Sequence, residues 1–99
     1  MEQIDKALQG IDPMVYYRAA VYYYDTNRDL AKALDWINTA LASKETYVIL
    51  HAKAKIQAKM GDKKGAIATA EKSKVLALKE GNENFIDLNN KAIAEWSKK

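Results

Sequence analysis

The sequence lacks cysteine altogether and contains one proline and four glycines in 99 residues. Without cysteine the chain has no disulfide, no thiolate metal ligand and no thiol nucleophile. The low proline and glycine content leaves few positions at which a helix must break, and the abundant alanine and lysine favour helices over strands. The composition therefore predicts an all-α fold.

Long apolar runs are also missing, since no segment approaches the roughly 20 apolar residues that span a bilayer. The N-terminal stretch does not have the charged-then-apolar order of a signal peptide. We therefore expect a soluble chain that does not insert into a membrane, and the sequence leaves its compartment unknown. With 48% hydrophobic residues, the length suits a single domain over residues 1–99.

The net charge of +3 is unevenly distributed along the chain. Residues 1–50 carry five basic and seven acidic side chains, whereas residues 51–99 carry eleven and six. The basic second half favours acidic partners, but lysines distributed around helices also form an ordinary solvated surface. Both interpretations stay open at this point.

Capping residues divide the chain into helices. Asp12 and Pro13 are typical of a helix start, and this helix is predicted to end near Thr26. The next starts are expected at Asp29, at Ser43 or Thr46, at Asp62, and at Asn82 or Asn84. Gly61 suits a left-handed C-terminal position, and the helix after it is predicted to end at Gly81. A short helix over Glu2–Gln9 brings the expected number to five or six.

Small and apolar residues recur along the chain at one fixed spacing, the interval that separates Ala33 from Ala66. Within each copy they follow the helical period, so they share one face, and small side chains there let two helices approach closely. A repeat of this length is typical of stacked helical hairpins. The positions related by this repeat spacing are Ala33 and Ala66; Ile4, Ile37 and Ala70; and Ala7, Ala40 and Ser73.

The residues around these positions resemble the tetratricopeptide repeat. Tyr17, Ala20, Val21 and Tyr24, followed by the small-residue face, are similar to the family's pattern of aromatic, apolar, small and aromatic positions. The second copy keeps the turn and the small residues but has Lys53, Gln57 and Ala70 at bulky positions, and neither copy has the family's closing proline. The resemblance implies antiparallel hairpins stacked as a short right-handed α-solenoid.

The resemblance also implies a division of the chain. Residues 12–44 and 45–81 correspond to two repeats, residues 1–11 to the remnant of a preceding hairpin, and residues 82–99 to a capping helix. A start within a repeat suggests the C-terminal helical part of a longer bacterial protein.

In this family, partner peptides bind in the concave groove lined by the first helix of each hairpin. The resemblance therefore places two sets of side chains in a groove that binds a protein or peptide, with an acidic one favoured by the cations. These are Arg18, Tyr22, Asp25 and Thr26 on one helix, and His51, Lys55 and Lys59 on the next.

Tyrosines gather in the first predicted helix as two adjacent stripes, Tyr17 with Tyr24 and Tyr16 with Tyr23. Packing against neighbouring helices explains most of them. A second interpretation is that Tyr16 and Tyr23 are only partly covered and form a face for self-association or for docking to the parent protein. The domain would then be a structural appendage.

Catalysis is not expected. The single histidine has no carboxylate one turn away to orient it, and no recognisable metal-ligand spacing or phosphate-binding glycine loop occurs. We therefore predict no enzyme activity, no metal and no cofactor. RNA binding by the lysine-rich segment 51–79 is disfavoured, because few aromatic residues lie between the lysines and two repeats offer few reading positions.

Overall fold

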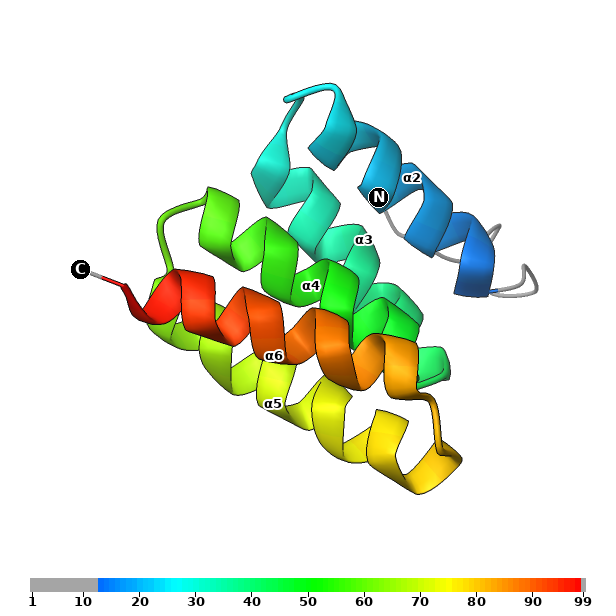
Figure 1. Ribbon diagram of the computed structural model, residues 1–99. Helices are drawn as coiled ribbons and strands as arrows, with labels where there is room; N and C mark the ends of the chain where they lie inside the picture. The colour runs from blue at the N-terminus through cyan, green and yellow to red at the C-terminus, as the bar shows by residue number, and fades with distance from the viewer. Residues whose placement is uncertain (1–12, 99) are drawn as a thin grey trace.

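The computed structural model describes residues 13–98, which form five helices and no strand (Figure 1). The all-α prediction is confirmed. The predicted segment Glu2–Gln9 and the cap Asp12 lie outside the described residues. The helices are α2 (Pro13–Asp25), α3 (Leu30–Ser43), α4 (Tyr47–Lys59), α5 (Lys63–Glu80) and α6 (Glu83–Ser97).

Four helices begin at the capping residues that the sequence indicates. The side chains of Asp29, Thr46, Asp62 and Asn82 each accept a hydrogen bond from the backbone N–H three residues further on, over 2.9–3.2 Å. Such a bond satisfies one of the N–H groups that a helix start leaves without a partner. The predicted starts of α3 to α6 are therefore confirmed.

Left-handed residues close three of the helices. Gly61 follows α4 with φ of 97°, and Gly81 follows α5 with φ of 72°, as glycine permits. After α2 the corresponding residue is Asn27, with φ of 57°. Asparagine is one of the few side chains that tolerates this region.

The small-residue faces form the centre of both hairpins. Every described residue that recurs at the repeat spacing has a relative exposure of 0%. The predicted face is thus confirmed as the packing face, while Ile4 and Ala7 lie outside the described residues. The buried pairs are Ala33 with Ala66, Ile37 with Ala70, and Ala40 with Ser73.

The helices stack in sequence order. Each helix packs against the next along the chain, and α4 also contacts α2 and α6. Between residues 13 and 98, α2 does not contact α5 or α6, and α3 does not contact α5. Contacts are therefore confined to helices that are adjacent or next but one in the sequence. In the view of Figure 1 the helices follow one another in the order α2, α3, α4, α6 and α5.

Helix α4 is buried on two sides because it stands in the middle of the stack. Ile49, Ala52 and Ile56 belong to the core formed with α2 and α3. Leu50 is also buried and lies beside residues of α5. The remaining face of α4 lies towards α2 and α6, which α4 also contacts.

Candidate functional site

The first hairpin turn is one residue longer than the second. Residues 26–29 separate α2 from α3, whereas residues 60–62 separate α4 from α5. The first residues of α3 and α5, Leu30 and Lys63, are separated by the repeat spacing. The last residues of α2 and α4 are separated by one residue more than the repeat spacing. Tyr17 and Val21 of α2 therefore correspond in space to His51 and Lys55 of α4.

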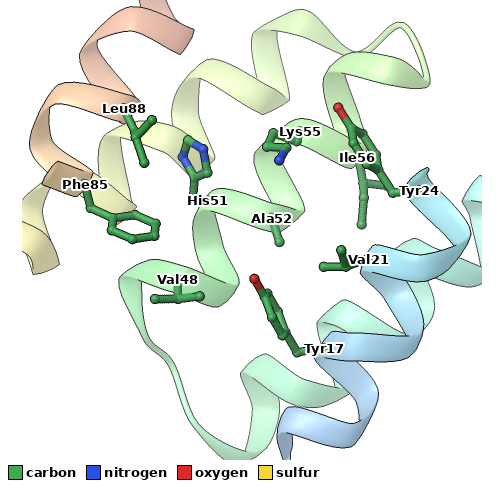
Figure 2. Close-up of a pocket in the computed structure, with 10 residues that line it drawn as sticks. All are labelled: Tyr17, Val21, Tyr24, Val48, His51, Ala52, Lys55, Ile56, Phe85 and Leu88. Carbon is green, nitrogen blue, oxygen red and sulfur yellow. The ribbon is translucent and has the colours of Figure 1, made fainter.

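A groove with a volume of about 240 Å³ lies along this face. Side chains from α2, α4 and α6 converge on it, as Figure 2 shows. Most of the lining is apolar or aromatic, and polar groups come from two tyrosines, one histidine and one lysine. The groove is defined here by Tyr17, Val21, Tyr24, Val48, His51, Ala52, Lys55, Ile56, Phe85 and Leu88.

Of the residues that the sequence assigns to a groove, the structure places His51 and Lys55 in this one. Arg18, Tyr22 and Asp25 are exposed side chains of α2 that do not line it. The longer turn is the physical reason, because a one-residue offset rotates the groove-facing positions of a helix by about 100°. Their neighbours Tyr17, Val21 and Tyr24 line the groove instead.

Two lysines surround the ring of Tyr24 at the edge of the groove. The Nζ atoms of Lys55 and Lys59 lie 5.2 and 4.4 Å from its centroid. Lys59 Nζ also donates a hydrogen bond of 3.0 Å to the Tyr24 carbonyl oxygen. Burial, and secondarily the charge of Asp25, raise the pKa of Tyr24, so its phenol stays neutral at physiological pH. The two ammonium groups thus meet an aromatic face, not a carboxylate.

His51 is joined to α6 and α5 by a chain of hydrogen bonds. Its Nδ1 lies 2.7 Å from Oδ1 of Asn89, a side chain with 0% exposure. Asn89 Nδ2 donates to Ser73 Oγ over 2.8 Å, and Ser73 Oγ donates to the carbonyl oxygen of Tyr47 over 2.7 Å. Because every buried polar side-chain atom among the described residues has a partner, this network meets the requirement for burying polar groups.

Phe85 of α6 covers the histidine from the side. The His51 and Phe85 rings meet edge to face, with centroids 5.6 Å apart and planes at 87°. Burial is the main reason why the pKa of His51 is lowered from 6.5; the Asn89 hydrogen bond raises it, and the charge of Lys55 lowers it further. His51 is therefore mostly neutral at physiological pH.

The proposed self-association face is largely covered. Tyr16 has a relative exposure of 8% and belongs to the core. Tyr23 is half-buried, and its ring packs edge-on against Trp36 with centroids 4.8 Å apart. Tyr16 is thus covered, while Tyr23 keeps part of its surface exposed, and self-association stays a prediction.

Sequence reasoning missed the contribution of α6 to the groove. Phe85, Leu88 and Asn89 all come from the segment assigned only a capping role. One signal was present, because Asn89 lies one turn from both Phe85 and Ile93 on an apolar face, where an amide requires a buried partner. The identity of that partner, 38 residues away in the sequence, required the structure.

Within residues 13–98, no three histidine or acidic side chains come together as metal ligands. None of the helices described is long and apolar enough to cross a membrane. Comparisons with protein-family models, with curated proteins and with solved structures found no match.

Proposed function

We propose that this domain is a protein interaction module that binds a peptide or protein segment in the groove between α2, α4 and α6. The observation that carries this proposal is the groove itself, a concave and mostly apolar surface to which three helices contribute. Apolar concavities with a few polar groups are the usual form of a binding site. Ala52 and Ile56 of the groove's lining belong to the core, whereas Leu88, also in the lining, is 44% exposed and accessible to a ligand.

The charges at the groove favour an acidic segment. Among residues 13–98 the only ion pair joins Lys98 and Glu95, so Lys55 and Lys59 have no carboxylate partner. An acidic side chain near them would gain an ion pair, while the segment's apolar side chains would bury the surfaces of Val21 and Leu88. The expected ligand therefore combines apolar anchors with acidic residues.

A displayed library of random twelve-residue peptides tests this function. Selection is expected to enrich peptides that contain both leucine-like and acidic residues, and their affinities can be measured by fluorescence anisotropy. The diagnostic variants are Leu88→Glu in the groove and Leu78→Glu on α5. These two leucines are 44% and 55% exposed, so both changes add the same charge at an accessible position.

The two variants are expected to behave differently. Leu88→Glu should weaken binding at least tenfold, because it removes an apolar contact and repels an acidic ligand, while Leu78→Glu should change it less than twofold. Equal effects of the two changes would place the binding site elsewhere. If no peptide is enriched and light scattering shows a dimer, self-association replaces this proposal.

A further inference from the structure

The hydrogen-bond chain behind the groove fixes which nitrogen of His51 carries its proton. The Ser73 hydroxyl has one hydrogen, and it is donated to the Tyr47 carbonyl oxygen. Ser73 Oγ can therefore only accept from Asn89, which directs the amide nitrogen of Asn89 to Ser73 and its oxygen to His51. Nδ1 of His51 must then be the N–H donor.

The other ring nitrogen, Nε2, is consequently a free acceptor. Among residues 13–98 it has no hydrogen-bond partner. Since no buried polar side-chain atom of these residues lacks a partner, Nε2 is not buried and is accessible at the groove. A neutral Nε2 presents a lone pair, whereas a protonated Nε2 presents an N–H and a positive charge.

Few charged groups surround this nitrogen. On α4 the only one is Lys55, one turn away, and Tyr47 is a phenol. The α6 side chains against His51 are Phe85 and Asn89, the α5 group is Ser73, and α2 presents the phenols of Tyr17 and Tyr24 across the groove. No carboxylate faces the ring, so a proton on Nε2 of the free protein would add a second cation beside Lys55 without compensation.

We propose that the groove binds a carboxylate of its partner segment between Nε2 of His51 and the ammonium of Lys55, and that binding is coupled to uptake of one proton from solvent by Nε2. This inference rests on the proposed function of the same groove. A carboxylate placed there converts two repelling cations into a bridged pair, with charge-assisted hydrogen bonds to both. Affinity for acidic segments then rises as the pH falls.

The coupling has a defined sign. Protonation of His51 increases carboxylate affinity by some factor, and by linkage a bound carboxylate increases the proton affinity of His51 by the same factor. The pKa of His51, lowered by burial in the free protein, must therefore rise on binding. Asn89 acts as a positioning residue, because its oxygen keeps the proton on Nδ1 and leaves Nε2 to titrate.

Because the chain contains one histidine, its titration can be followed without ambiguity by ¹⁵N NMR of the imidazole. Two N-acetylated, C-amidated twelve-residue peptides serve as probes, one in which leucine alternates with aspartate and one with asparagine in place of aspartate. In the free protein the nitrogen shifts should show the Nδ1–H tautomer. The aspartate peptide should raise the pKa of His51, and the asparagine peptide should not.

Affinity measured at several pH values gives the second readout. The aspartate peptide should bind the wild type at least fivefold more tightly at pH 5.5 than at pH 8. His51→Asn removes the titrating nitrogen while its amide can still donate to Asn89, so this variant should lose the pH dependence. Lys55→Met should weaken binding at every pH but preserve some proton uptake.

The outcomes separate the two proposals. Tight binding of the aspartate peptide with no rise in the pKa of His51, or an Nε2–H tautomer in the free protein, would overturn the proton coupling and leave the groove as a binding site. Absence of binding by either peptide, together with an unproductive library selection, would overturn both.

Discussion

The two hairpins have the same helical arrangement but hold their helices together by different chemistry. In the first, aromatic rings close the interface, with Tyr23 against Trp36 at 4.8 Å. In the second, hydrogen bonds do so: Thr69 Oγ1 donates to Gln57 Oε1 over 2.6 Å, and Ser73 binds the Tyr47 carbonyl. The shared small-residue face sets how closely the helices approach, and the flanking contacts are free to differ.

The difference also determines where function can develop. The aromatic hairpin supplies the groove with tyrosine and valine surfaces, whereas the polar hairpin supplies a histidine held from behind by buried amide and hydroxyl groups. A buried polar network is costly unless each member is satisfied, so it fixes one arrangement of its side chains. The second hairpin together with α6 is therefore the part able to position a titrating group.

The largest effect is expected at the shared face. Ile37 is fully buried, and its counterpart in the second hairpin is the smaller Ala70, so the first hairpin depends more on this position. Ile37→Ala should lower the free energy of unfolding by about 3–4 kcal/mol, through lost burial and the cavity left behind. Denaturant unfolding followed by circular dichroism measures this loss. A loss below about 1 kcal/mol would show that the stability of the hairpin does not depend on this side chain.

The next effect concerns the polar network. Asn89→Ala should cost about 2–3 kcal/mol, because it removes two hydrogen bonds and leaves the part-buried Nδ1–H of His51 without an acceptor, while Ser73 keeps its bond to the Tyr47 carbonyl. The neighbouring Asn90 is exposed, so Asn90→Ala is the matched control and should change stability by less than about 0.5 kcal/mol. Thermal unfolding of the two variants distinguishes a buried network from a general preference for asparagine in α6.

A smaller effect is expected from the side-chain contacts that hold the two helices of each hairpin together. Double-mutant cycles with Tyr23→Leu and Trp36→Leu, and with Gln57→Leu and Thr69→Val, should each give a coupling energy of about 0.5–1.5 kcal/mol. Similar couplings would mean that ring packing and hydrogen bonding are interchangeable at this interface. A coupling near zero in one hairpin would show that its contact is incidental.

The smallest effect expected is the dependence of folding stability on pH. Burial lowers the pKa of His51 below the value of 6.5 for the unfolded chain, so the unfolded state takes up a proton more readily than the folded state. The stability contributed by neutral His51 is present above about pH 6.5 and is lost as the pH falls through the lower folded value. Denaturant midpoints between pH 8 and pH 5.5 should decrease in the wild type and stay flatter in His51→Asn; parallel curves would contradict this.

The sequence predicts the helices well because their ends are set by local interactions. The helix starts depend on side chains that accept a hydrogen bond from the N–H three residues away, namely those of Asp29, Thr46, Asp62 and Asn82. Gly81 has a positive φ angle that glycine itself permits, without help from distant residues. The buried face is predictable for the same reason, since a repeated spacing places the same positions on the same side of a helix.

The groove is predicted only in part because it depends on long-range geometry. The extra residue in the turn 26–29 shifts α2 by one position relative to α4 in the repeat. The repeat spacing between α3 and α5 does not reveal this shift. His51 and Asn89 are 38 residues apart in the sequence, and no local pattern predicts that they pair. Local physics therefore identified the elements, while packing determined which side chains meet.

The most direct test of the groove is an NMR titration of amide and methyl signals with the aspartate–leucine peptide. Shift changes are predicted at Val21, Val48 and Leu88, which come from three different helices and line the groove. Val75 and Leu78, exposed on α5 outside it, should not change. Changes confined to Val75 and Leu78, with Val21 and Leu88 unaffected, would contradict the account.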